Sequence, residues 1–241
     1  MQDGVEERGR VKWRKLTTLY RRITRLELRI LILLALVLGG LWAFLALAEV
    51  AVEEESHPFD TRILLAMRNP ADSGDPLGPP WFEEMMRDIT ALGGTGVVAF
   101  VTLSSVGFLL IRRDYGTAAL IVVAIVGAYA LSIGLKLTFD RPRPDLVARS
   151  TEVFNPSYPS GHSMLSAASY LTLGAVLARV QAWRRLKIYI LSLAIVLTLA
   201  IGISRVYLGV HWPTDVLGGW AAGSVWAIIV WLLANWQRRP G

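Results

Sequence analysis

Three short polar blocks in this sequence carry residue types that suit chemistry on a phosphate group. Positively charged side chains can bind phosphoryl oxygens, and arginine does so through two parallel hydrogen bonds. Histidine can serve as a nucleophile or a proton donor, and a carboxylate can orient it. The blocks are Lys136 with Arg143-Pro144, then Pro159-Ser160-Gly161-His162, then Ser204-Arg205 with His211 and Asp215.

The second block predicts a turn that runs directly into a helix. Ser160 suits the N-cap position, and Gly161 lets a ligand approach the backbone closely. Free backbone N–H groups and the positive end of the helix dipole favour an anion at such a start. His162 is the only histidine in the blocks besides His211, which makes it the candidate general acid.

The third block places a carboxylate four residues after a histidine. Pro213 favours a helix that begins near that point, because its missing N–H is harmless in a first turn. Asp215 would then stand one turn beyond His211 and accept its Nδ1–H. This hydrogen bond fixes the tautomer and leaves Nε2 as the nucleophile.

Long apolar segments separate the blocks and must position them. The chain has 241 residues, of which 54% are hydrophobic, and it has no cysteine, so disulfides and thiolate metal sites are excluded. About 20 helical residues cross the apolar core of a bilayer. We therefore predict an all-α bundle of six transmembrane helices in one domain, residues 30–241, after a basic segment, residues 1–29. The predicted spans are Ile30–Val52, Leu92–Ile111, Thr117–Leu137, His162–Val180, Leu186–Ile203 and Val216–Trp236.

Positive charge is unevenly distributed over the connections between these spans. Most Lys and Arg residues fall on one side, which the positive-inside rule assigns to the cytoplasm together with both termini. Because successive spans alternate in direction, the motif-bearing ends all fall on the opposite, extracytoplasmic side and can meet in one pocket. The cytoplasmic group comprises segment 1–29, Arg112, Arg113, Arg179, Arg184, Arg185, Lys187, Arg238 and Arg239.

The segment between the first two spans is acidic and contains two short amphipathic pieces, near residues 59–67 and 81–89, with a turn over 69–80. These pieces either lie at the lipid–water interface or cap the bundle. Gly219 and Gly223 form a small-xxx-small pair in the last span. The pair favours close packing within the chain, with a homodimer as the alternative.

The three blocks together resemble the type 2 phosphatidic acid phosphatase (PAP2) superfamily. The family pattern is K-x6-R-P, then P-S-G-H, then S-R-x5-H-x3-D. The sequence matches it without departure from Lys136 to Asp215. Separately, Lys136 could be a snorkelling anchor and His211 with Asp215 an ordinary helix start. If all of these alternatives held, the order and spacing of the three blocks and their location on one side of the membrane would be coincidences.

The resemblance implies a mechanism and a role for each residue. His211 attacks phosphorus to give a phosphohistidine, Asp215 orients His211, and His162 protonates the leaving oxygen and then activates water. No metal and no cofactor are expected, since positive side chains replace a metal ion. The residues implied to hold the phosphoryl oxygens are Lys136, Arg143, Ser160, Gly161 and Arg205.

The predicted function is hydrolysis of a lipid phosphate monoester or pyrophosphate at the outer face of a membrane. We expect this membrane to be the plasma membrane of a bacterium. Candidate substrates are undecaprenyl pyrophosphate, phosphatidic acid, phosphatidylglycerol phosphate and lipid A phosphates. Two alternatives stay open. The first is a phosphotransferase that uses the same phosphohistidine. The second is a non-catalytic transporter or scaffold that binds lipid phosphate. The expected partners are the substrate and the bilayer, and no nucleic acid.

Overall fold

A computed structural model describes the chain except for residues 1–26, 29, 53–56, 148–154 and 238–241. The chain divides into two compact units, Met1–Gly39 and Gly40–Gly241. In the first, the described residues 27, 28 and 30–39 are helical, and the helix Ile30–Val52 continues into the second unit. Nearly all of the predicted basic segment 1–29, and the C-terminal pair Arg238 and Arg239, lie outside the described residues.

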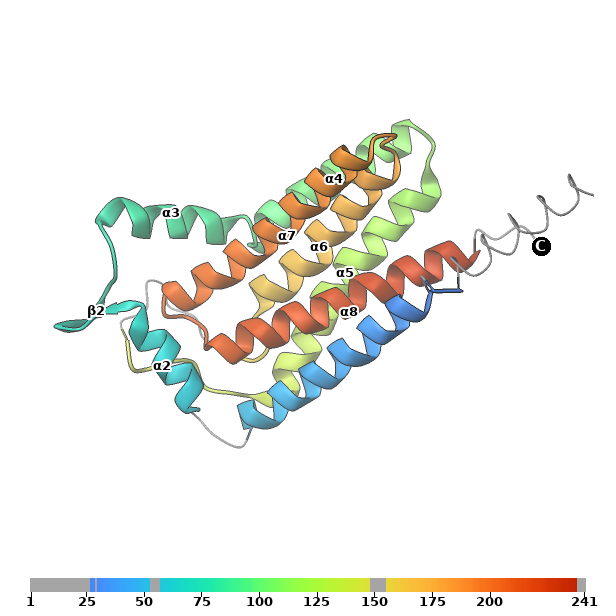
Figure 1. The fold of residues 1–241 in the computed structure, drawn as a ribbon. Coiled ribbons are helices and arrows are strands. Elements are labelled where there is room, and N and C mark those ends of the chain that lie inside the picture. Colours follow the sequence, from blue (N-terminus) through green and yellow to red (C-terminus); the bar gives the residue numbers. More distant parts are fainter. Residues whose placement is uncertain (1–26, 29, 53–56, 148–154, 238–241) are drawn as a thin grey trace, which may run out of the picture. The chain divides into compact units, whose positions relative to one another are not determined.

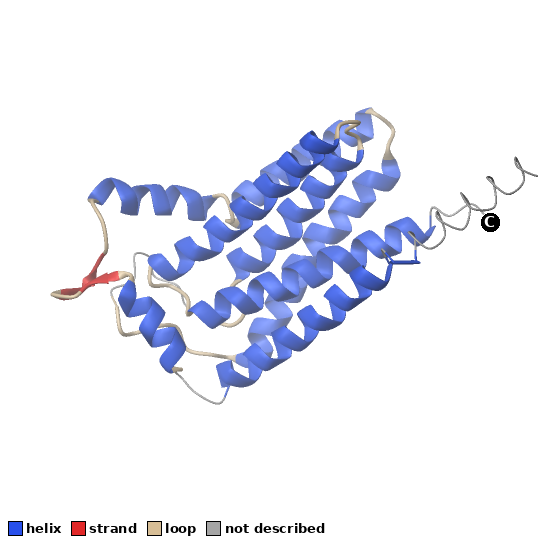
Figure 2. Cartoon of the chain, in the orientation of Figure 1, coloured by secondary structure: helices blue, strands red, loops and turns tan. Residues whose placement is uncertain are grey.

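Five long helices of the second unit, α4 to α8, run alongside one another, and the predicted motifs lie at or beside the ends of α5 to α8 (Figure 1). Two shorter helices, α2 and α3, come before them in the sequence. A two-stranded antiparallel hairpin joins α2 to α3, and the rest of the described chain is helix or loop (Figure 2). The elements are α2 (Pro58–Ala66), β1 (Arg68–Asn69), β2 (Asp72–Pro76), α3 (Pro80–Ala91), α4 (Thr95–Ile111), α5 (Tyr115–Phe139), α6 (Gly161–Arg179), α7 (Arg184–Tyr207) and α8 (Pro213–Gln237).

Four helices of the described chain are long and apolar enough to cross a membrane: Ile30–Val52, Tyr115–Phe139, Arg184–Tyr207 and Pro213–Ala234. Helices α3 and α4 make a fifth candidate if the pair, bent by 47°, forms one span. Helix α6 is not among the candidates. It is rich in Ser, Ala and Gly, and many of its residues are buried by the surrounding helices. The prediction of six spans therefore stays a prediction.

Close packing of α6 against α8 depends on small residues. A Cβ atom on Gly219 would lie 2.6 Å from the carbonyl oxygen of Ser160, at the start of α6. A Cβ atom on Gly223 would lie 2.9 Å from the Cβ of Ala167. The two predicted small residues thus serve packing within the chain, and they bring the first turns of α6 and α8 together.

The connection between α2 and α3 differs from the predicted turn, because part of it pairs as a hairpin. Asn69 pairs with Asp72, and the Oδ1 of Asn69 accepts a hydrogen bond of 3.1 Å from the backbone N–H of Ala71. Asx-type bonds of this kind stabilise tight turns without a glycine. Helices α2 and α3 occupy the two stretches with amphipathic pattern, and their location outside the membrane stays a prediction.

Candidate active site

The predicted site residues meet where four helix ends converge. Lys136 is in the last turn of α5 and Arg205 in the last turn of α7, while His162 and Asp215 are in the first turns of α6 and α8. A cavity of about 380 Å³ lies between these ends. Two predicted residues, Ser160 and Asp215, are fully buried and do not line it. Those that do are Lys136, Arg143, Gly161, His162, Arg205 and His211.

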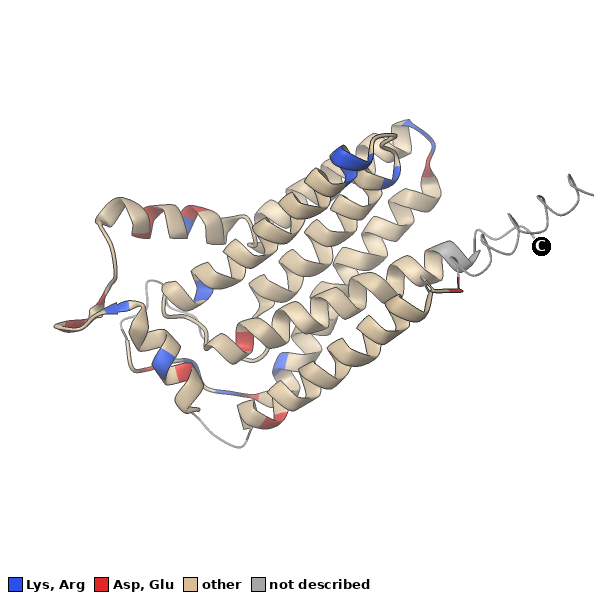
Figure 3. Cartoon of the chain, in the orientation of Figure 1, with Lys and Arg blue, Asp and Glu red and all other residues tan. Residues whose placement is uncertain are grey.

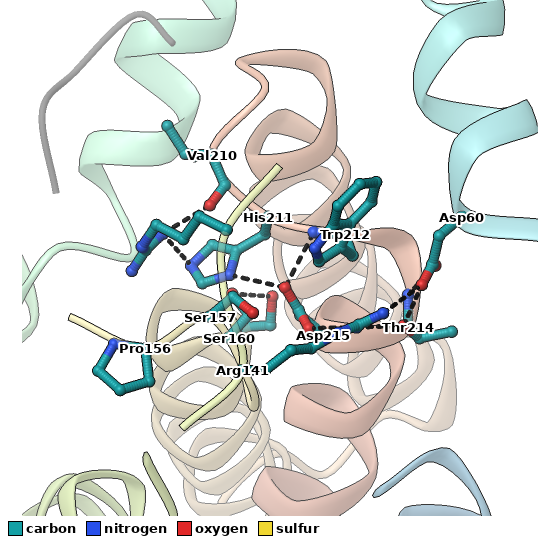
Figure 4. Close-up of polar contacts among 12 residues, drawn as sticks. Asp60, Arg141, Pro156, Ser157, Ser160, Val210, His211, Trp212, Thr214 and Asp215 are labelled. Atoms are coloured by element: carbon teal, nitrogen blue, oxygen red, sulfur yellow. Dashed lines mark hydrogen bonds and ion pairs between the residues drawn. The ribbon is translucent and has the colours of Figure 1, made fainter. Parts of the chain in front are cut away.

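His211 and Asp215 adopt the arrangement that their spacing predicts. Helix α8 begins at Pro213. The Nδ1 of His211 lies 3.3 Å from the Oδ2 of Asp215, and the same oxygen accepts a hydrogen bond of 2.9 Å from the backbone N–H of Trp212 (Figure 4). The carboxylate is thus held both by the start of its own helix and by the imidazole.

Arg143 determines which nitrogen of His211 carries the proton. Its Nη1 lies 3.2 Å from the Nε2 of His211 and also donates to the carbonyl oxygen of Val210, while its Nε donates to that of Asn155. A guanidinium can only donate hydrogen bonds, so Nε2 accepts and Nδ1 bears the hydrogen. The Nε2 lone pair therefore points toward Arg143, and both residues line the cavity.

The His211 imidazole is held in its neutral form. Its pKa is lowered well below the ordinary value of 6.5, chiefly because the ring is buried and further because Arg143, Arg205 and Lys136 are nearby. Both effects disfavour the charged form of a histidine. A neutral imidazole is the form that can attack an electrophile.

Lys136 and Arg205 bring positive charge to the same cavity from opposite helices. The Nζ of Lys136 donates to the carbonyl oxygen of Pro156 at 2.5 Å, and the Nη1 of Arg205 donates to the Oγ1 of Thr90 at 3.1 Å. The buried Nε of Arg205 has no hydrogen-bond partner among the described residues. A Cβ atom on Gly161 would lie 3.6 Å from the Cε of Lys136. The glycine thus leaves room beside the lysine.

Ser160 occupies the predicted N-cap position of α6, but its hydroxyl makes no capping hydrogen bond. Its Oγ instead accepts a hydrogen bond of 3.0 Å from Ser163, and its backbone N–H donates to the carbonyl oxygen of Asp215 at 2.9 Å. In this geometry Ser160 joins α6 to α8 and does not face the cavity. Its predicted contact with phosphoryl oxygens stays a prediction.

His162 lies beside the short break between α3 and α4. A Cβ atom on Gly94 would lie 3.8 Å from the Nε2 of His162, and one on Gly93 would lie 3.5 Å from its Cβ. Gly93 and His162 both line the cavity, as does His211. The two motif histidines therefore border the same space, His162 from the first turn of α6 and His211 from the loop between α7 and α8.

Three residues that the sequence reasoning missed form a buried network behind the histidine. Arg141 donates to Asp215 and to Asp60, and Thr214 bonds to both Arg141 and Asp60 (Figure 4). Arg141 lies between Lys136 and Arg143, so its position within the first block could have indicated that it belongs to the site. Nothing in the sequence around Asp60 points to the site.

Several known proteins that are similar to this chain carry phosphatase names. The family model of the PAP2 superfamily matches residues 117–239. Phosphatidylglycerophosphatase B of Bacillus subtilis is 33% identical over 154 residues, which are 63% of this chain and 74% of the relative. Undecaprenyl-diphosphatase of Sulfolobus acidocaldarius is 31% identical over 121 residues, 48% of this chain and 54% of the relative.

Solved structures agree with these sequence matches. The crystal structure of the transmembrane PAP2 type phosphatidylglycerolphosphate phosphatase from Bacillus subtilis superposes with a TM-score of 0.73 at 28% identity. The superposition covers 84% of this chain and 98% of that one. Aquifex aeolicus LpxE, at 24% identity and a TM-score of 0.57, shares the fold; 74% of this chain and 98% of that chain are covered. The chain therefore belongs to the PAP2 superfamily, in its membrane-integral lipid phosphatase branch.

Proposed function

We propose that the protein hydrolyses lipid phosphate monoesters or diphosphates through a phosphohistidine formed on His211. One observation carries the proposal. A neutral His211, whose Nε2 contacts Arg143, lines the same cavity as Lys136, Arg143 and Arg205. A nucleophile and a cluster of cations around one space are what transfer of a phosphoryl group requires.

In the first step the Nε2 of His211 forms a bond to phosphorus while the bond to the lipid oxygen breaks. The ring becomes cationic, and Asp215 stabilises it through the Nδ1–H. His162 gives a proton to the departing oxygen. The guanidinium of Arg143, which contacts Nε2 in the free site, leaves that nitrogen and pairs with a phosphoryl oxygen instead.

In the second step water attacks the phosphorus and the N–P bond breaks, which restores neutral His211. His162, now without its proton, takes one from the water. Inorganic phosphate then leaves. The positive side chains neutralise the phosphoryl charge in both steps, so the proposed mechanism uses no metal ion.

A lipid substrate fits the position and size of the cavity. About 380 Å³ suits a headgroup and not a whole lipid. Tyr129 and Ile133 of α5 line the cavity, and 45% and 46% of their surface is exposed. Between them, an acyl or prenyl chain could extend into the bilayer while its phosphate stays inside. The names of the relatives, a phosphatidylglycerophosphatase and an undecaprenyl-diphosphatase, support this substrate class.

The charge distribution supports an extracytoplasmic site in a bacterial plasma membrane. Lys and Arg gather where α4 is joined to α5 and α6 to α7, at the end of the bundle away from the cavity (Figure 3). These are Arg112, Arg113, Arg179, Arg184, Arg185 and Lys187. The positive-inside rule assigns that end to the cytoplasm, so the cavity opens outside.

The test is phosphate release by the purified protein from a panel of lipid phosphates in detergent. We expect release without any added acceptor and its loss in His211→Ala. His57→Asn is the matched control, because His57 caps α2 and asparagine is also a good cap. Release by His211→Ala at the wild-type rate would overturn the proposal. Release that requires an acceptor would identify a phosphotransferase.

A further inference from the structure

Arg141 and Arg143 leave the same loop but contact opposite sides of the catalytic pair. Arg143 lines the cavity and reaches the Nε2 of His211 at 3.2 Å. Arg141 does not line the cavity, and its Nη1 donates to the Oδ1 of Asp215 at 2.7 Å, behind the imidazole. Both side chains of the Arg141–Asp215 ion pair are 0% exposed. The two arginines therefore have different tasks.

Asp60 holds Arg141 from the other side. Its Oδ2 accepts a hydrogen bond of 2.9 Å from the Nη2 of Arg141, and the Asp60 side chain is also 0% exposed. Thr214 closes the network: its Oγ1 accepts from Arg141 at 2.7 Å and donates to Asp60 at 2.6 Å, and its backbone N–H donates to Asp60 at 2.8 Å. A residue of α2 is thus bonded to the first turn of α8.

The network gives each oxygen of Asp215 a fixed task. Oδ1 faces Arg141, and Oδ2 faces the His211 ring and the backbone N–H of Trp212. A carboxylate held at both oxygens cannot rotate away from Nδ1. Arg141 is itself a buried cation, which is costly without a counter-ion. Asp60 supplies a counter-ion through Nη2, and Nη1 of the same guanidinium hydrogen-bonds to Asp215.

We propose that Arg141 and Asp60 are positioning residues of the phosphatase reaction. Through them, the packing of α2 against α8 holds Asp215 and His211 in place. Asp60 orients Arg141, Arg141 orients Asp215, and Asp215 orients His211. Neither residue touches the substrate. The inference rests on the proposed function, since it assigns a role in the same phosphohistidine chemistry.

Kinetics of Asp60→Asn, Arg141→Gln and Arg143→Gln separate positioning from phosphate binding. In the first two we expect kcat to fall by about tenfold to a hundredfold, by analogy with the loss when a group that orients a metal-binding histidine is removed. The KM and the inhibition constant of inorganic phosphate should stay within about threefold, because phosphate meets neither residue. Arg143→Gln should instead raise the inhibition constant by about tenfold or more.

Three further variants guard against a purely structural effect. Asp75→Asn changes an exposed carboxylate of the hairpin and should leave kcat unchanged. Thr214→Val removes one member of the network without removing a charge and should lower kcat in the same direction. Arg141→Lys keeps the charge beside Asp215 and should recover part of the kcat that Arg141→Gln loses. Melting temperatures in detergent report the fold of each variant.

An unchanged kcat in folded Asp60→Asn and Thr214→Val would overturn the inference. So would a phosphate inhibition constant that rises in Arg141→Gln as much as in Arg143→Gln, because Arg141 would then be a phosphate ligand. The wild-type protein and His211→Ala are measured alongside. Absence of turnover in the wild type would defeat the proposed function, whereas an active wild type with unaffected variants would defeat the positioning role alone.

Discussion

The Nη1 of Arg143 lies 3.2 Å from the Nε2 of His211, the atom that attacks phosphorus in the proposed mechanism. In that mechanism the arginine has two partners in turn: the imidazole before substrate binds, and a phosphoryl oxygen afterwards. This exchange keeps Nε2 unprotonated and close to the incoming phosphate. It also makes the ionisation of His211 the first property to test.

The pKa of His211 is lowered by burial and by nearby cations, so we expect the ring to stay neutral well below pH 6.5. The ring signals of ¹⁵N-histidine-labelled protein measure this in an NMR titration, with His211→Gln to assign them. A midpoint at pH 6.5 or above would contradict the site geometry.

The same shift has a consequence for stability. Below pH 6.5 the unfolded chain takes up a proton at this histidine and the native site does not. Stability should therefore fall as the pH drops from 6.5 toward the lower folded pKa. Melting temperatures of the wild type between pH 7 and 5 should fall more steeply than those of His211→Gln; equal slopes would argue against a buried neutral ring.

Asp215→Asn should lower kcat by a factor of about 10³ to 10⁴, as replacing the orienting carboxylate of a histidine does elsewhere. An amide cannot stabilise the cationic ring, and its NH₂ group could face Nδ1 and favour the wrong tautomer. Because Asp215 does not line the cavity, inhibition by inorganic phosphate should change little. A large change in phosphate affinity with kcat retained would argue against the orienting role.

Gly219→Ala should destabilise the protein by about 1–3 kcal/mol, because the added Cβ would lie 2.6 Å from the carbonyl oxygen of Ser160. Gly134→Ala in α5 is the matched control, since a Cβ atom added there would meet nothing within 4 Å. Thermal unfolding in detergent compares the two. Equal melting temperatures would show that α6 and α8 do not pack as closely as described.

Much of the site followed from the sequence because its determinants are local. The four-residue spacing of His211 and Asp215 predicts their contact within one helical turn, and Pro213 marks where that turn begins. Alternation of the apolar segments also predicted that the ends bearing Lys136 and Arg205 would lie near each other, and both line the cavity.

The missed features depend on contacts between distant parts of the chain. Asp60 and Thr214 are 154 residues apart, and no local pattern marks a carboxylate that will be buried against another helix. The hydrogen bond that the Oγ of Ser160 accepts from Ser163 likewise depends on how the first turn of α6 packs, and the predicted contact of Ser160 with phosphoryl oxygens stays a prediction. The hairpin of residues 68–76 escaped notice because its strands are short and polar, without apolar alternation.

Activity should persist in excess EDTA, because Lys136, Arg143 and Arg205 supply the positive charge that a metal ion gives other phosphatases. The measurement is phosphate release from the best substrate of the panel before and after chelation, with Mg²⁺ added back. Loss of activity on chelation, restored by Mg²⁺, would contradict this part of the mechanism.

The most direct test of the account is to trap the phosphoryl group on the enzyme. The wild type and His162→Gln are mixed with ³²P-labelled substrate that has a good leaving group, and the reaction is quenched in alkali, in which phosphohistidine survives. We predict label on the peptide that contains His211, more of it in His162→Gln because water is no longer activated, and none in His211→Ala. Steady turnover with no label on His211, or with label on another residue, would contradict the central claim.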